Sequence, residues 1–139
     1  RSINGVTFYN DSIGSSPTRT IATLSAFPGN VVLIAGGYDK KLCYDDLCPV
    51  LQQRAKALVL MGATADKIEQ AYHDYIEKKG LPSLPIARVK SMEDAVAKAY
   101  ELACSGDVVL LSPASASFDM YSNFMERGNH FKQIVSQMD

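Results

Sequence analysis

Residues 31–41, VVLIAGGYDKK, decide the fold. Five consecutive apolar residues, VVLIA (31–35), run directly into two glycines. A short, unbroken and β-branched run is typical of a parallel strand that is covered on both faces. Paired glycines allow a ligand or a neighbouring backbone to approach the turn closely. The segment therefore predicts a buried strand followed by a strand-to-helix loop.

Similar runs flank this strand on both sides, and they read GVTFYN (5–10), ALVLM (57–61), IARV (86–89) and VVLL (108–111). Residues 68–76 and 92–103 between them carry apolar side chains at three- and four-residue spacing, which is typical of amphipathic helices. Ser16-Pro17 is a helix start signal, and Gly80 is a helix stop. A last helix is expected from about Asp119 to the C-terminus. Alternating strands and helices predict an α/β, Rossmann-like three-layer domain, with a mostly parallel sheet and helices on both faces.

The composition is that of one ordinary globular domain spanning residues 1–139, with 47% hydrophobic and 21% charged residues. A net charge of −1 without long runs of one sign predicts neither a nucleic-acid surface nor a membrane-facing patch. The sequence has no apolar run of about 20 residues and no secretory start. We expect a cytoplasmic protein and a monomer.

The cysteines do not form a recognisable metal or disulfide pattern. There are three of them, Cys43, Cys48 and Cys104, and an odd count argues against a disulfide framework. His73 and His130 are the only histidines, and a structural zinc site usually needs four well-spaced ligands. The expectation is buried thiols in a reducing compartment, and no metal bound by this domain.

Ligands of open α/β sheets sit beyond the carboxyl ends of the strands, and three loops of this kind carry unusual residues. The first loop is NDSIGSS (10–16), whose free helix-start amides and hydroxyls suit an anion, while Asp11 suits ribose hydroxyls or a hydrated cation. Turn and cap formation alone would equally explain its Asp and Ser residues.

The second loop is AGGYDKK (35–41). Its Lys40 or Lys41 could bind a carboxylate or phosphate, or could simply be solvated. The loop does not have the residue spacing of a Walker A motif.

The third loop is LSPASASFD (111–119), which follows the last buried strand. Its small residues expose backbone amides and the hydroxyls of Ser115 and Ser117, a combination that could hold a carboxylate or could be a simple capped turn. A serine nucleophile needs an adjacent base, and the loop has neither a nearby histidine nor the G-x-S-x-G spacing.

Together these loops resemble the C-terminal domain of the Mur ligases. The segments that carry the resemblance are YNDSIGSSPTRTIATLSAF (9–27), VLIAGGYDKK (32–41) and LSPASASFDMYSNFMERGNHF (111–131). They occur in order along nearly the whole chain, and SPASASFD followed by NF..RG is the most specific. Within the family, the resemblance points to the branch that adds D-glutamate to UDP-N-acetylmuramoyl-L-alanine with ATP and Mg²⁺, through an acyl phosphate, in peptidoglycan synthesis.

The resemblance also implies roles for individual residues. Lys40 and the turn of Ser117 and Phe118 match positions that hold D-glutamate, and Phe124 matches an aromatic wall of that pocket. Ser15 stands where the family often has a threonine that contacts substrate. Asp11 matches a position that reaches ATP from this domain.

Two departures from the family pattern stand out. Many members read NDSKAT, whereas this chain has Ile13, so the lysine's contribution would be absent or come from elsewhere, with Arg19 as a candidate. The chain begins at Arg1, past a basic residue of the family that contacts ATP, and the UDP-binding and central ATPase domains are absent from it. We therefore expect no ligation and no cofactor binding by this domain alone.

Two other interpretations stay open at this stage. One is a free-standing α/β module that binds a ligand or regulates, such as a receiver domain, although the acidic cluster of receivers is missing around Asp11 and Asp39. The other is a sister ligase that adds a different amino acid, or adds glutamate to folate.

Overall fold

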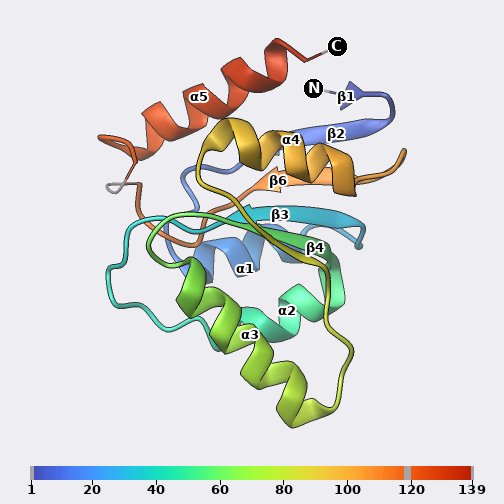
Figure 1. The fold of residues 1–139 in the computed structure, drawn as a ribbon, viewed down its shortest axis with the longest axis vertical. Coiled ribbons are helices and arrows are strands. Elements are labelled where there is room, and N and C mark those ends of the chain that lie inside the picture. The colour runs from blue at the N-terminus through green and yellow to red at the C-terminus, as the bar shows by residue number, and fades with distance from the viewer. Residues whose placement is uncertain (1, 118–119, 139) are drawn as a thin grey trace.

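The computed structural model describes residues 2–117 and 120–138, and their strands form one six-stranded sheet (Figure 1). The strand order is β1-β2-β6-β3-β4-β5. The short β1 pairs antiparallel with β2, and all other neighbours are parallel. The strands are β1 (Ser2–Ile3), β2 (Val6–Asn10), β3 (Val31–Ala35), β4 (Ala55–Leu60), β5 (Ile86–Arg88) and β6 (Val108–Leu111).

Helices cover both faces of the sheet (Figure 1). One face carries α1 (Pro17–Ser25), α2 (Leu47–Arg54) and α3 (Ala65–Lys79), and the other carries α4 (Met92–Leu102) and α5 (Phe124–Ser136). Alternate residues of β3 point to opposite faces, so that Leu33 packs with the first group and Ile34 with the second. The predicted three-layer α/β fold with a mostly parallel sheet is confirmed.

Local sequence signals set the helix ends much as expected. The Ser16 hydroxyl accepts a hydrogen bond from the Arg19 N–H at 3.3 Å, and Pro17 occupies the first helical position of α1. Gly80 ends α3 in the left-handed region at φ 67°, where a residue without Cβ is unstrained.

The start of the last helix was predicted wrongly. The helix α5 begins at Phe124, and the Asn123 side chain caps it by accepting from the Glu126 N–H at 2.9 Å. The predicted start at Asp119 falls outside the described residues, and residues 120–123 form a non-helical connection. A strong capping residue therefore overrides the general helical pattern upstream of it.

The position of β6 between β2 and β3 determines where a ligand site can lie. The chain runs outward from β3 to β5 and then returns to insert β6 beside β2, which places the first, second and third loops next to one another. This is a topological switch point, where open α/β sheets bind their ligands. Within the described residues, no helix combines the length and the apolar character that crossing a membrane requires.

Candidate functional site at the carboxyl edge of the sheet

Backbone hydrogen bonds join the second loop to the third. The Gly36 N–H donates to the Pro113 carbonyl at 2.9 Å, and the Tyr38 N–H donates to the Ala116 carbonyl at 2.8 Å. Gly36 has φ 109°, and a Cβ at this position would lie 1.9 Å from the Met61 carbonyl oxygen. Only glycine therefore permits this close approach of the two loops to the end of β4.

The first loop is held against the third by both backbone and side-chain contacts. The Ala114 N–H donates to the Gly14 carbonyl at 2.8 Å, and Ala114 has a left-handed φ of 56°. One carboxylate oxygen of Asp11, Oδ2, accepts from the hydroxyls of Thr23 and Ser112, each at 2.7 Å. A Cβ on Gly14 would come within 2.7 Å of that same oxygen. Asp11 therefore connects the first loop to α1 and to the third loop. Among the described residues, no hydrogen bond is found to its other carboxylate oxygen, Oδ1.

Arg127 in α5 connects the first and third loops from behind. Its side chain is 1% exposed. The Nε atom donates to the Ser12 hydroxyl at 2.9 Å, and one terminal nitrogen donates to the Ser12 carbonyl at 2.6 Å and to the Ser15 hydroxyl at 3.2 Å. The other terminal nitrogen donates to the Ser115 carbonyl at 2.8 Å. The Ser12 hydroxyl in turn donates to the Phe124 carbonyl at 2.7 Å, which fixes the start of α5.

Buried hydroxyls continue this network toward the second loop. The Ser115 hydroxyl lies 2.8 Å from the Thr64 hydroxyl and 2.9 Å from the Tyr44 hydroxyl. Thr64 accepts from the Gly37 N–H at 2.9 Å, and its own N–H donates to the Gly37 carbonyl at 3.0 Å. We call this set the edge network, and its residues are Ser12, Ser15, Tyr44, Thr64, Ser115 and Arg127.

Lys40 projects from the second loop as an exposed cation. Its neighbour Asp39 is engaged elsewhere, because its carboxylate accepts from the Lys41 N–H at 2.7 Å and from the Lys67 ammonium at 3.2 Å. These hydrogen bonds hold the pKa of Asp39 below its usual value. Within the part of the chain that the structure describes, Lys40 forms no ion pair, so its charge is available to an anionic ligand.

The other predicted site residues that the structure describes lie on the same edge. Ser15 is half-buried beside Arg127, and Phe124 is 40% exposed at the first position of α5. Ser117 is 4% exposed, and its carbonyl accepts from the Met120 N–H at 3.0 Å and from the Tyr121 N–H at 2.8 Å. Phe118 lies outside the described residues.

Several apolar side chains near these polar groups in the sequence are exposed. Five large hydrophobic side chains are exposed on the loops and on the start of α5, namely Ile13, Tyr38, Met120, Phe124 and Met125. Ile13 is the residue that replaces the lysine of the Mur ligase pattern, and Arg19 is exposed in the first turn of α1.

The connection that follows the third loop is tied to both helices of its face. The Tyr121 hydroxyl lies 2.5 Å from His130 Nδ1 in α5, and His130 Nε2 lies 3.3 Å from a carboxylate oxygen of Glu93 in α4. Burial, with the nearby charge of Glu93, raises the pKa of Tyr121 to about 12. Tyr121 therefore stays protonated and ties the described part of this connection, residues 120–123, to α5.

The sequence had not singled out three members of the edge network: Tyr44, Thr64 and Arg127. Arg127 lies within the segment 111–131 that resembles the Mur ligases, immediately before Gly128. A Cβ on Gly128 would lie 2.9 Å from an Asn10 side-chain atom and 3.1 Å from the Cβ of Ser12, so this glycine lets α5 approach the first loop. The pair Arg127-Gly128 was therefore the feature of the sequence that could have pointed to Arg127.

Among residues 2–117 and 120–138, no group of three or more His, Cys, Asp and Glu side chains is placed to hold a metal ion.

Fold and site together define an α/β domain with a candidate ligand site at the carboxyl edge of a mostly parallel sheet. The family described as "Mur ligase, glutamate ligase domain" matches residues 1–115. The chain belongs to this family, and the resemblance inferred from its three loops is confirmed.

Its relatives include proteins named UDP-N-acetylmuramoylalanine–D-glutamate ligase. The chain is 59% identical to that of Acetivibrio thermocellus over 140 residues, and 54% identical to that of Clostridium kluyveri over 138 residues. These alignments cover 100% and 99% of this chain but 30% of each relative. The chain thus spans about a third of the length of the relatives that it matches.

Solved structures support the fold. A domain of a putative UDP-N-acetylmuramate:L-alanyl-γ-D-glutamyl-meso-diaminopimelate ligase from Haemophilus ducreyi superposes with a TM-score of 0.61 at 18% identity, covering 98% of this chain and 94% of that one. The UDP-N-acetylmuramate–alanine ligase of Thermotoga maritima gives 0.51 at 12% identity, covering 87% of this chain and 25% of that one.

Proposed function

We propose that this chain is the C-terminal, amino-acid-binding domain of an ATP-dependent ligase that adds D-glutamate to UDP-N-acetylmuramoyl-L-alanine in peptidoglycan synthesis. The observation that carries the proposal is the 59% identity, along the whole chain, to a relative named UDP-N-acetylmuramoylalanine–D-glutamate ligase. The gathering of the first, second and third loops at one edge of the sheet supports it. In this proposal residues 1–139 form a single domain, and the UDP-binding and ATPase domains belong to other parts of the protein.

D-glutamate presents two carboxylates and an amine, and the edge offers groups suited to each part. Lys40 is an exposed cation without an ion pair among the described residues, so we assign it to a glutamate carboxylate. The turn at Ser117 and Phe118 is assigned to the other carboxylate, Ser15 to a polar substrate contact, and Phe124 to the apolar wall of the pocket. The burial of Ser117 favours contact through the turn backbone over contact through its hydroxyl.

In the proposed reaction, phosphoryl transfer from ATP activates the carboxylate of the UDP-linked L-alanine, the D-glutamate amine attacks it, and phosphate leaves. This domain would hold the amine in line for attack, which is a positioning role. We assign Asp11 to ATP, because its two hydrogen bonds from hydroxyls use Oδ2, no hydrogen bond to Oδ1 is found among the described residues, and a carboxylate suits ribose hydroxyls. The described residues offer no cluster for Mg²⁺, so in this proposal its ligands come from the ATPase domain.

The domain alone would not ligate, because the glutamate pocket must close against a domain that binds ATP. The reactants, ATP and a UDP-linked precursor, place the proposed enzyme in the cytoplasm. A monomer is sufficient, since each chain would carry the complete set of domains.

The test is ligation by the full-length protein that carries this domain. With ATP, Mg²⁺ and UDP-N-acetylmuramoyl-L-alanine, phosphate release should depend on D-glutamate and should not respond to L-glutamate or to other amino acids. Phosphate release driven by a different amino acid, or by a folate acceptor with glutamate, would assign the protein to a sister ligase. No release with any amino acid would contradict the ligase proposal.

A further inference from the structure

The edge network does more than fill a buried space, because its bonds together link the first, second and third loops of the proposed glutamate pocket. We propose that Arg127, acting through Ser115 and Thr64, is a positioning residue that fixes the relative placement of these loops before D-glutamate binds. This inference rests on the proposed function, since it concerns how that same pocket is held.

The first half of the network sets the first loop against the third. A guanidinium is a planar fork with donors in fixed directions, so the acceptors that it binds are held at a fixed spacing. Here the fork reaches Ser12 and Ser15 on one side and the Ser115 carbonyl on the other. Arg127 is 1% exposed, and water therefore does not compete for these bonds.

The second half transmits this placement to the loop that carries Lys40. Ser115 is the junction, because its carbonyl accepts from Arg127 while its hydroxyl contacts Thr64 and Tyr44. Thr64 exchanges two hydrogen bonds with the backbone of Gly37, three residues before Lys40. Ser117 follows Ser115 by two residues. The two positions assigned to the glutamate carboxylates, Lys40 and the turn at Ser117, are therefore both connected to Ser115.

This arrangement matters for catalysis because the Lys40 side chain is long and exposed, and its own packing does not fix it. The direction in which the Lys40 side chain points depends on the backbone of the second loop, and the edge network holds this backbone through Gly37. A displacement of about 1 Å at a reacting group can cost on the order of 100-fold in rate. Loss of a hydrogen bond in the edge network should therefore raise the KM for D-glutamate, while the contacts of the other substrates stay in place.

Steady-state kinetics of the full-length ligase test this inference, with Thr64→Val and Thr64→Ser as a matched pair. Valine keeps the shape of threonine and removes the hydroxyl, whereas serine keeps the hydroxyl that reaches Gly37 and Ser115. We expect Thr64→Val to raise the KM for D-glutamate by about 10-fold, with the KM for ATP changed by less than about 2-fold. Thr64→Ser should return the KM for D-glutamate close to the wild-type value.

Arg127→Lys tests the fork itself, and Arg88→Met is its control, because Arg88 lies on β5 outside the network. Arg127→Lys should raise the KM for D-glutamate selectively, and Arg88→Met should leave all three substrate constants unchanged. If Arg127→Lys does not fold, the Thr64 pair decides. Folded Thr64→Val enzyme with an unchanged KM for D-glutamate, or with equal rises for all substrates, would overturn the positioning role. A wild-type enzyme that does not use D-glutamate would instead refute the proposed function.

Discussion

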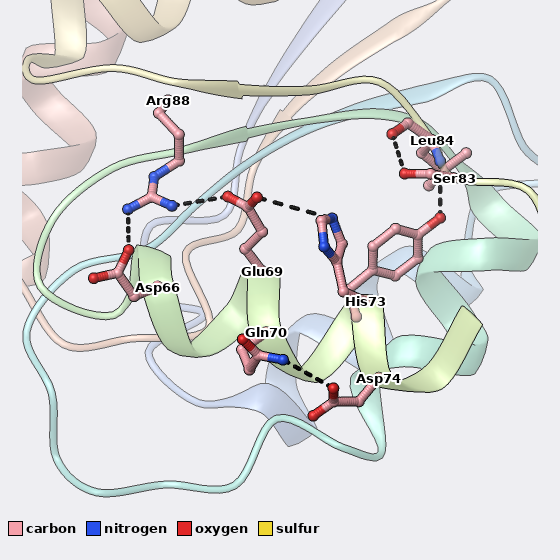
Figure 2. Close-up of polar contacts among 9 residues, drawn as sticks. Asp66, Glu69, Gln70, His73, Asp74, Ser83, Leu84 and Arg88 are labelled. Carbon is pink, nitrogen blue, oxygen red and sulfur yellow. Dashed lines mark hydrogen bonds and ion pairs between the residues drawn. The ribbon is translucent and has the colours of Figure 1, made fainter. Parts of the chain in front are cut away.

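Two arginines of this domain sit in opposite surroundings. Arg127 is 1% exposed and donates to hydroxyls and carbonyls of the first and third loops. Arg88, at the end of β5, has a side chain that is 45% exposed, and it pairs with Asp66 and with Glu69 of α3, the latter at 2.8 Å (Figure 2). The ion pairs of Arg88 tie an edge strand to a helix, whereas the bonds of Arg127 tie the proposed site together.

From this difference we expect burial, more than formal charge pairing, to decide how much each arginine contributes to the free energy of unfolding. In Figure 2 the Arg88 side chain meets Glu69 from one side and His73 approaches Glu69 from the other, at 3.8 Å. Solvent reaches the whole group, because even its least exposed side chain, that of Glu69, is 28% exposed. Water and salt screen such pairs, and exposed ion pairs typically contribute about 0.2–1 kcal/mol. Buried hydrogen bonds to a charged donor contribute more, and losing the donor leaves polar groups unsatisfied.

The largest effect is expected for Arg127→Met. This change keeps an apolar stem but leaves the carbonyls of Ser12 and Ser115 without this donor. We expect the free energy of unfolding to fall by about 3 kcal/mol or more, because each unsatisfied buried acceptor costs about 1–3 kcal/mol. Urea unfolding monitored by circular dichroism measures the change. A loss below about 1 kcal/mol would place Arg127 in the same class as an exposed ion pair.

An intermediate effect is expected for the pair of Lys56 and Asp107 at the opposite edge of the sheet. The ammonium lies 2.5 Å from the Asp107 carboxylate, which is 8% exposed and also accepts from the Cys104 N–H at 2.7 Å. Burial alone would raise the pKa of Asp107, but these two hydrogen bonds outweigh it and hold the pKa below its usual value. We expect Asp107→Asn to cost about 1–2 kcal/mol at neutral pH.

The lowered pKa of Asp107 gives this pair a pH signature. Its stabilising contribution is complete above the ordinary aspartate pKa of about 4 and is lost as the pH falls through the lower native pKa. The difference in unfolding free energy between wild type and Asp107→Asn should therefore shrink below about pH 4. A difference that stays constant from neutral to acid pH would show that the carboxylate charge is not the source of the effect.

The smallest effect is expected for Arg88→Met. Removal of both exposed ion pairs should change the free energy of unfolding by no more than about 1 kcal/mol, and added salt should reduce the difference further. Urea unfolding at low and high salt measures it. A loss as large as that of Arg127→Met would remove the contrast between the two arginines.

The sheet could be predicted from sequence because its strands are short, unbroken apolar runs. The run VVLIA became β3 with the predicted bounds, and the predicted strand at residues 57–61 became β4, Ala55–Leu60, shifted by a residue or two. The helix α2 was not predicted, because LCPVLQQR is short and lacks a regular apolar spacing. The start of α5 was placed about five residues early, since Asn123 was not recognised as its cap.

The loops were predicted, but the contacts that hold them together were not. The family pattern singled out Lys40, Asp11 and Phe124, and the structure places all three at the carboxyl edge. Arg127 and Ser12 are separated by 115 residues, and their contact depends on the strand order, which periodicity does not encode. A long-range hydrogen bond of this kind is visible only once the sheet is assembled.

The central claim is that this edge of the domain holds D-glutamate, and the KM for D-glutamate of the full-length ligase with Lys40→Ala tests it most directly. The matched control is Lys79→Ala, since Lys79 is an exposed lysine at the far end of α3. Loss of the lysine contact to a carboxylate should raise the KM for D-glutamate by about 10-fold or more, with little change in the KM for ATP and no effect of the control. Equal constants for Lys40→Ala, Lys79→Ala and wild type would contradict the account, because the glutamate pocket would then lie elsewhere.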